Sequence, residues 1–86
     1  MPQLSRFFGI IISMYFQDHN PPHFQAAYNE FKCVIDIETL EITKGDLPPR
    51  AYKMVAEWAS LHIEELLENW QEAQSTGNFK KIEPLK

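Results

Sequence analysis

The first half of the chain carries short apolar runs in which side-chain character alternates, as it does along β-strands. Branched and aromatic residues dominate the first run, which is too short for a typical helix. A later run alternates cleanly, with Phe31, Cys33 and Ile35 on one side and mostly charged residues on the other. These runs predict an antiparallel meander of three to four strands over residues 7–16, 23–28, 31–37 and, more briefly, 41–43.

The first predicted strand is apolar on both of its faces. The side chains at alternate positions of one face are all large and apolar: Phe8, Ile10, Ile12, Met14 and Phe16. A strand that is apolar on both sides is typical of the interior of a sheet. We therefore expect residues 7–16 to form a central strand rather than an edge strand.

The second half of the chain has helical periodicity. The segment from Gly45 to Pro49 marks the switch, because proline is well tolerated in the first turn of a helix. Side chains that recur every three to four residues then form one stripe, apolar except for His62: Ala51, Val55, Trp58, Ala59, His62, Leu66 and Trp70. We predict one long helix over about residues 49–74, followed by a short tail, residues 78–86, that docks through its apolar side chains.

The composition agrees with one small folded domain. Apolar residues make up 44% and charged residues 23% of the 86 residues, which is close to the average for globular proteins and argues against disorder. A chain of this length has room for one core only. The expected architecture is a single α+β domain over residues 1–86, with the meander packed on the long C-terminal helix.

Charge and targeting signals argue against several classes of protein. The formal net charge is −4 and the basic residues are scattered, which disfavours broad nucleic-acid binding but leaves open a short RNA held at one site. The apolar run of residues 7–12 is interrupted by Gly9 and is too short to span a bilayer, so we expect a cytoplasmic protein. Cys33 is the single cysteine, which rules out a disulfide within the chain, and it is expected to fill space in the core.

A double-proline turn carries the densest group of reactive side chains. Asp18 and His19 precede Pro21 and Pro22, and His23 follows them, so two imidazoles and a carboxylate flank a stiff corner. Histidine exchanges protons near neutral pH, binds metals and hydrogen-bonds phosphates, and a rigid support holds it in place. The structural alternative is that Asp18 caps the turn and a histidine completes its hydrogen-bond network.

Two further residues extend this candidate site. His62 falls within the apolar stripe of the predicted helix, where it needs a hydrogen-bond partner or a cavity; the structural alternative is a satisfied core histidine. Arg6 offers a planar guanidinium that clamps a phosphate or carboxylate, unless it is an ordinary surface arginine. If the helix lies across the strand ends near the proline turn, Arg6, His19, His23 and His62 form one catalytic site.

Three histidines also raise the question of a metal, and the pattern argues against one. His19 and His23 are four residues apart, a spacing that aligns two ligands on a helix, but the prolines between them prevent a helix. The zinc-protease pattern HExxH, Gly-rich phosphate loops and dinucleotide fingerprints are all missing from the sequence. We therefore expect neither a metal nor an organic cofactor.

Longer motifs run through nearly the whole chain. They are SRFFGI at residues 5–10, DHNPPHF at 18–24, GDLPPR at 45–50, WASLH at 58–62, ELLENW at 65–70 and KIEPL at 81–85. Together they resemble a small bacterial family catalogued as domain of unknown function 4160. The resemblance implies a component of a toxin–antitoxin-like two-gene module, with a protein partner encoded nearby. The family pattern has another histidine where this chain has Gln25, and glutamine neither shuttles protons near neutral pH nor ligates zinc well.

Two functions from different classes stay open. In the first, the chain is an RNA-directed effector in which Arg6 holds phosphate and two of the histidines act as base and acid. In the second, it is a non-catalytic module with structural histidines that binds a protein through a sheet edge, the acidic face of the helix or the tail. A second copy of the chain is a further candidate partner. The sequence does not decide whether the protein is an enzyme.

Overall fold

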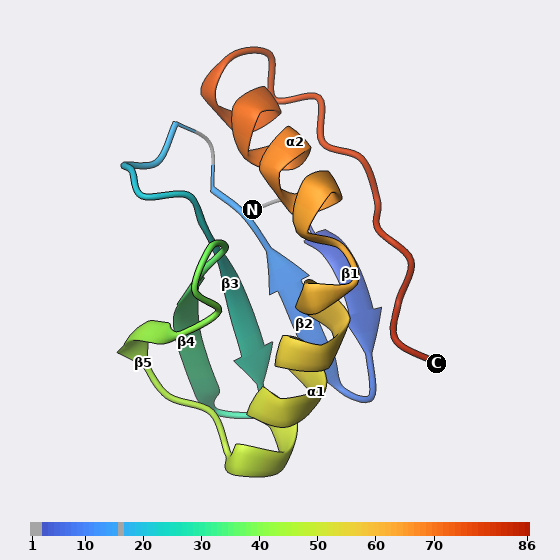
Figure 1. The fold of residues 1–86 in the computed structure, drawn as a ribbon. Helices are drawn as coiled ribbons and strands as arrows, with labels where there is room; N and C mark the ends of the chain where they lie inside the picture. The colour runs from blue at the N-terminus through green and yellow to red at the C-terminus, as the bar shows by residue number, and fades with distance from the viewer. Residues whose placement is uncertain (1–2, 16) are drawn as a thin grey trace.

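The computed structural model describes residues 3–15 and 17–86 of the chain. It confirms an α+β architecture, in which two helices lie over one face of a single antiparallel sheet (Figure 1). The strands follow one another in space in the order β1-β2-β3-β4-β5, so each pairs with its neighbour along the chain. The elements are β1 (Gln3–Phe7), β2 (Ile10–Ser13), β3 (His23–Tyr28), β4 (Phe31–Asp36), β5 (Ile42–Gly45), α1 (Pro49–Ser60) and α2 (Ile63–Gln74).

The prediction of one strand over residues 7–16 is wrong, because the chain turns back on itself within this run. Phe8 and Gly9 both have positive φ angles, 48° and 80°, as a two-residue type I′ hairpin turn requires, and Phe7 pairs with Ile10 across it. Gly9 adopts such angles without strain. The apolar run therefore supplies the end of β1, an edge strand, and the whole of β2. Phe16 lies outside the described residues.

The remaining strands follow the alternation more closely. β3 has the predicted bounds, and β4 ends at Asp36, one residue before the predicted end. Asn29, with a φ of 52°, turns the chain between them. β5 covers Ile42–Gly45 rather than residues 41–43. The sheet therefore has five strands, where three to four were predicted.

The predicted single helix is broken into α1 and α2. His62, with φ −131° and ψ 27°, leaves the helical conformation and becomes the N-cap residue of α2, whose first backbone hydrogen bond runs from the Leu66 N–H to the His62 carbonyl. Glu64 and Glu65 occupy the first turn of α2, where negative charge interacts favourably with the helix dipole. The apolar stripe continues through the break, and both helices turn it toward the core.

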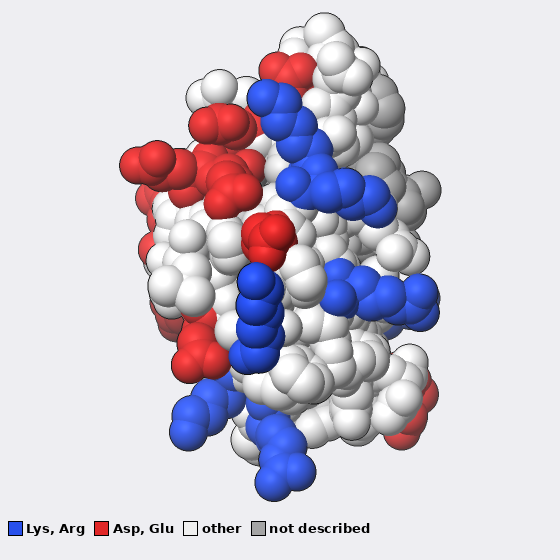
Figure 2. All heavy atoms as spheres, turned by 90° about the vertical axis from the view of Figure 1, so that its right-hand side faces the viewer, with Lys and Arg blue, Asp and Glu red and all other residues white. Residues whose placement is uncertain are grey.

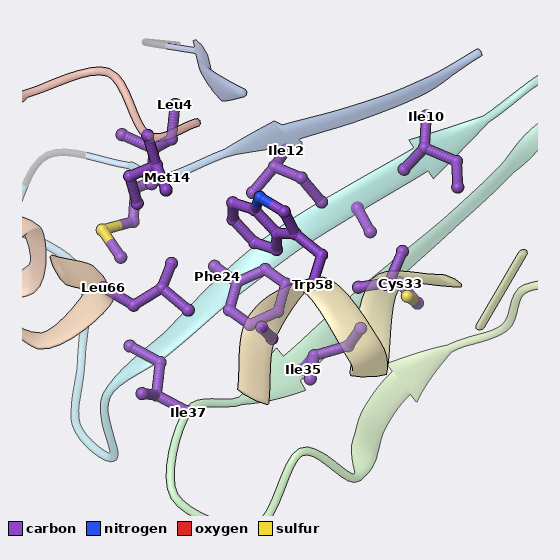
Figure 3. Packing of buried hydrophobic residues seen from close by; sticks show 14 of the residues in the cluster. Leu4, Ile10, Ile12, Met14, Phe24, Cys33, Ile35, Ile37, Trp58 and Leu66 are labelled. Atoms are coloured by element: carbon purple, nitrogen blue, oxygen red, sulfur yellow. The ribbon is translucent and has the colours of Figure 1, made fainter. Parts of the chain in front are cut away.

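Trp58 of α1 lies at the centre of that core (Figure 3). It is fully buried, and its ring contacts those of Phe7 and Phe24 at centroid distances of 5.4 and 6.1 Å. Cys33 is buried as predicted, and burial raises the pKa of its thiol to about 11. The docking of the tail is also confirmed, because Ile82 is buried in the same cluster. No helix in the described part of the chain is long and apolar enough to cross a membrane.

Candidate functional site

The proline turn is organised around His23. Its Nε2 lies 2.9 Å from Oδ2 of Asp18, and its Nδ1 lies 2.8 Å from the carbonyl oxygen of Pro21. The imidazole also packs against the indole of Trp70 in α2, with ring centroids 4.9 Å apart. The turn and the last turns of α2 are therefore held together by a polar and an aromatic contact at the same side chain.

A backbone hydrogen bond strengthens this attachment. The N–H of Gln17 donates to the carbonyl oxygen of Ala73 at 2.9 Å. Residues far apart in the sequence thus meet at the end of α2 that lies beside the loop between β2 and β3 (Figure 1). The turn is positioned by the helix as well as by its own two prolines.

Both ring nitrogens of His23 face oxygen acceptors. The Pro21 carbonyl accepts only, and so does the ionised carboxylate of Asp18. A neutral imidazole carries one N–H and donates to one of the two, whereas the imidazolium form donates to both. In either form both nitrogens face oxygen atoms of the chain itself, which makes His23 a member of the turn rather than an available base.

Asp18 titrates differently from an isolated aspartate. Its partial burial by itself raises the pKa, but the backbone N–H of His19 at 2.8 Å and the imidazole of His23 stabilise the charged form and outweigh the burial. The net result is a pKa below the ordinary value. The predicted alternative, in which Asp18 caps the turn and a histidine completes the network, describes these contacts.

A hollow of about 460 Å³ lies beside the turn. Its lining combines the turn with the ends of β4 and β5: Asp18, His19, Asn20, Pro21, His23, Val34, Asp36, Thr43 and Lys44. The structure thus brings His19 and His23 together, as predicted, and adds Asp36 and Lys44, which sequence reasoning missed. The two-residue turn at Asn29 could have revealed Asp36 from the sequence, because this turn sets the strand register that pairs His23 with Asp36.

His62 lies in a different environment. Its Nδ1 is 2.6 Å from Oε1 of Glu65, and its ring packs on Trp58 with centroids 5.5 Å apart. It lines a separate hollow formed by residues 60–65. The expectation that the three histidines share one pocket is therefore not met, because the helix break directs His62 to α1 and its own helix rather than to the proline turn.

Arg6 does not join the histidines either. It is exposed on β1, where it pairs across the sheet with Ile11 of β2. Because Phe7, the next residue, is buried in the core, the exposed Arg6 lies on the opposite face of the sheet, which the helices leave uncovered (Figure 1). We call this surface the open sheet face; the strand register assigns to it two neighbouring rows, Arg6, Ile11, Ala27 and Lys32, and then Ser13, Gln25, Val34 and Lys44.

The open sheet face has an apolar centre and a basic periphery. Ile11, Ala27 and Val34 are half-buried, with the half-buried Gln25 beside Val34. The exposed cations Arg6, Lys32 and Lys44 come from β1, β4 and β5. None of these three cations has an ion-pair partner among the described residues. Helix α2 has the opposite character, since its charged side chains are all acidic: Glu64, Glu65, Glu68 and Glu72.

Two carboxylates beside the open sheet face, which line a hollow together with Val34 and Lys44, are already engaged. Asp36 accepts hydrogen bonds at Oδ1 from the backbone N–H groups of Glu38 and Thr39, at 2.7 and 3.1 Å, and Asp18 is paired with His23. Within residues 3–15 and 17–86, no group of three or more His, Cys, Asp or Glu side chains is arranged to hold a metal ion. The positive charge of the face is therefore available to a molecule outside the chain.

Comparison with known proteins assigns the chain to a family. Residues 9–71 match the family described as Domain of unknown function (DUF4160), so the chain belongs to that family. The matched range contains the proline turn and the helix break, whereas Arg6 and the tail lie outside it. No curated protein and no solved structure matched the chain.

Proposed function

We propose that this chain is a non-catalytic binding module, one half of a toxin–antitoxin-like pair, and that it holds an acidic partner protein on the open sheet face. The observation that carries the proposal is the ring of unpaired cations, Arg6, Lys32 and Lys44, around an aliphatic centre. Protein interfaces have this anatomy, with an apolar core that excludes water and a charged rim that selects the partner.

The environments of the histidines support a binding role over a catalytic one. His23 has both nitrogens occupied by the turn, and His62 is held by Glu65 and Trp58 in another part of the molecule. Acid–base catalysis by two histidines needs both within reach of the same substrate atoms. Arg6 lies on the sheet, so it contributes charge to a surface rather than a clamp to a pocket.

The chemistry of the face favours protein over RNA. The two rows that define it contain no aromatic side chain, whereas single-stranded RNA is bound on aromatic side chains that stack with the bases. Three cations on a chain of net charge −4 match the few carboxylates of a protein segment better than the many phosphates of a nucleic acid. An acidic protein segment makes contact with the three cations and buries the aliphatic centre at the same time.

The test reverses charge on two sides of the face. Arg6→Glu combined with Lys44→Glu is co-expressed with the protein encoded by the adjacent gene, and the dissociation constant is measured by calorimetry at low and high salt. We expect at least about tenfold weaker binding than for the wild type, which is about 1.4 kcal/mol. The wild-type affinity is also expected to fall with added salt, because screening weakens attraction between exposed charges.

A matched control lies on the helical side of the molecule. Lys53 is an exposed lysine of α1, so Lys53→Glu changes the charge without touching the open sheet face. It should leave the dissociation constant unchanged. If the double variant and this control bind equally well, the face is not the docking surface. RNA that elutes with the wild type and is lost from the double variant would identify nucleic acid as the ligand instead.

One observation supports the competing RNA-directed function. Glu65 holds Nδ1 of His62, and Nε2 has no partner among the described residues, as in a histidine oriented by a carboxylate to act as a base. Under this alternative, His62→Gln abolishes growth arrest caused by expression of the chain, while the level of soluble protein stays the same. Unchanged growth arrest would remove His62 from any catalytic scheme.

A further inference from the structure

The tail, residues 78–86, is held to the rest of the domain through its main-chain atoms. The N–H of Ile82 donates to the carbonyl of Leu4 at 2.8 Å, which adds a strand-like hydrogen bond at β1. The indole N–H of Trp58 donates to the carbonyl of Glu83 at 2.7 Å. Figure 1 shows the tail running past α2 and along the side of the molecule where β1 lies.

Asn69 of α2 recognises the tail backbone at a second place. Its Nδ2 donates to the carbonyl of Lys80 at 3.0 Å, and its Oδ1 accepts the N–H of Lys80 at 2.7 Å. Asn69 is only 3% exposed, and Trp58 is fully buried. A buried polar atom without a hydrogen-bond partner destabilises the fold, so Asn69 and Trp58 both require a segment of backbone in the position of the tail. Their hydrogen bonds are made to main-chain atoms, so they recognise an extended backbone rather than particular side chains.

The side chains of the tail add selectivity. Ile82 is 4% exposed and enters the hydrophobic core. Lys80 and Lys81 line a hollow of about 270 Å³ together with glutamates of α2 that include Glu65 and Glu72. Figure 2 shows acidic side chains gathered beside basic ones on this side of the molecule. The site therefore suits an extended segment in which two lysines precede an aliphatic residue.

We propose that Leu4, Trp58 and Asn69 form a groove for such a segment, and that the tail of a second copy of this chain is its alternative occupant. The seated tail shows that this sequence fits, and exchange between two copies replaces each contact with an identical one. Gly77, with a φ of 74°, lies in the connection that redirects the tail. Exchange becomes appreciable when the chain concentration approaches the effective concentration of the attached tail, on the order of millimolar.

Two full-length variants separate the groove from the tail. Ile82→Asp places a charge where the tail enters the core, which releases the tail and leaves the groove intact. Asn69→Leu removes the paired amide, which weakens the groove and leaves the tail intact. Each variant alone is expected to be monomeric by size-exclusion chromatography with light scattering. Their mixture is expected to form a heterodimer, because one chain offers an empty groove and the other a free tail.

The control for the mixture is a chain that carries both Ile82→Asp and Asn69→Leu, which should not associate with the Ile82→Asp chain. A synthetic peptide of residues 78–86 is expected to bind the Ile82→Asp chain and to change the fluorescence of Trp58. The same peptide with the Ile82→Asp change should bind at least about tenfold more weakly. Failure to form the heterodimer would overturn the proposal, and so would peptide binding without it, since a second copy is then not the occupant.

Circular dichroism first establishes that the variants are folded. If Ile82→Asp prevents folding, the wild-type chain provides the test by itself. Differently labelled copies are mixed at a concentration on the order of millimolar, and NMR contacts between Ile82 and Leu4 are assigned to the same or to different copies. Contacts between different copies are expected. Contacts confined to one copy would rule out exchange of the tail.

Discussion

His23 and His62 contact the same two kinds of partner, a carboxylate and a tryptophan, but they connect different parts of the molecule. Each imidazole lies within hydrogen-bond distance of a carboxylate, 2.9 Å for Asp18 and 2.6 Å for Glu65, and each packs on a tryptophan. The second nitrogen of His23 also contacts Pro21, whereas that of His62 has no partner within the described residues. The first histidine joins a turn to a helix that is distant in sequence, and the second joins neighbouring residues at a helix end.

His23 therefore stabilises the fold, whereas His62 is held in place by the fold and contributes less to its stability. Removing His23 leaves Asp18 with only the backbone N–H of His19, takes a contact from the Pro21 carbonyl and detaches the turn from Trp70. Removing His62 costs one local pair with Glu65, whose side chain is 50% exposed. Exposed ion pairs contribute little, because water competes for both groups. The comparison therefore predicts an order of stability effects that mutants can test.

The largest effect is expected at the tryptophan that supports His62. Trp58→Ala empties the centre of the core and leaves the Glu83 carbonyl without its donor, so we expect a loss of about 4 kcal/mol in the free energy of unfolding, measured by urea denaturation. Trp70→Ala is the matched variant on the His23 side. It should cost less, because Trp70 is 4% exposed where Trp58 is fully buried, and its indole makes no hydrogen bond to another described residue. A larger loss of stability for Trp70→Ala than for Trp58→Ala would show that Trp70, and not Trp58, lies at the centre of the core.

His23→Ala comes next. We expect it to lower the free energy of unfolding by about 2 kcal/mol, since the contacts of the imidazole with Asp18, with the Pro21 carbonyl and with the Trp70 ring all disappear. His19→Ala provides the control in the same turn, because His19 is exposed and its backbone N–H, not its ring, contacts Asp18. Equal effects of the two changes in urea denaturation would contradict the structural role of His23.

His62→Ala should cost about half as much as His23→Ala, about 1 kcal/mol, because it removes one partly exposed pair and one ring contact. Double-mutant cycles with Glu65→Gln and with Asp18→Asn measure the two pairs directly by chemical denaturation. The coupling of Asp18 to His23 should exceed that of Glu65 to His62. The opposite ranking would mean that the short local pair carries more of the stability.

A smaller, pH-dependent effect follows from Asp18. Its pKa is lower in the folded chain, so its stabilisation is complete above the unfolded value and is lost as the pH falls through the folded value, below about pH 4. Thermal melting between about pH 5 and about pH 2, the range in which aspartate titrates, should therefore show a steeper loss of stability for the wild type than for Asp18→Asn. Parallel curves would show that Asp18 is not linked to folding.

The smallest effect is expected between the two helices. Leu61 is 69% exposed at the break, so Leu61→Gln should change the free energy of unfolding by less than about 0.5 kcal/mol. Urea denaturation measures it against Leu66→Ala, a buried position of α2 where a loss of about 3 kcal/mol is expected. A large effect at Leu61 would indicate that this side chain is covered by something other than the described fold.

The hairpin and the helix break show why parts of the fold escaped prediction. Residues 7–16 are almost continuously apolar, so periodicity did not reveal the turn, and only Gly9 marked it. The apolar stripe of the helices keeps its three-to-four-residue spacing from Val55 to Trp70, so it has the same appearance with or without a break at His62. β3 and β4 were predictable because their alternation and the turn at Asn29 agree.

The candidate site divides in the same way. The grouping of Asp18, His19 and His23 was predictable, since these residues are close in sequence around two prolines. The separation of His62 was not, because it depends on the backbone angles of one residue. The open sheet face required knowledge of the strand register, which brings Arg6 and Lys32 into one row although they are far apart along the chain.

The order of the strands has a consequence for how quickly the protein folds. Every strand pairs with its neighbour along the chain, so the sheet grows by closing short loops, and the entropy lost at each step is small. The hydrogen bond between Ile82 and Leu4 instead joins opposite ends of the described chain. Stopped-flow experiments should therefore show a sheet that assembles rapidly, with the last segment settling onto it in a later and slower step.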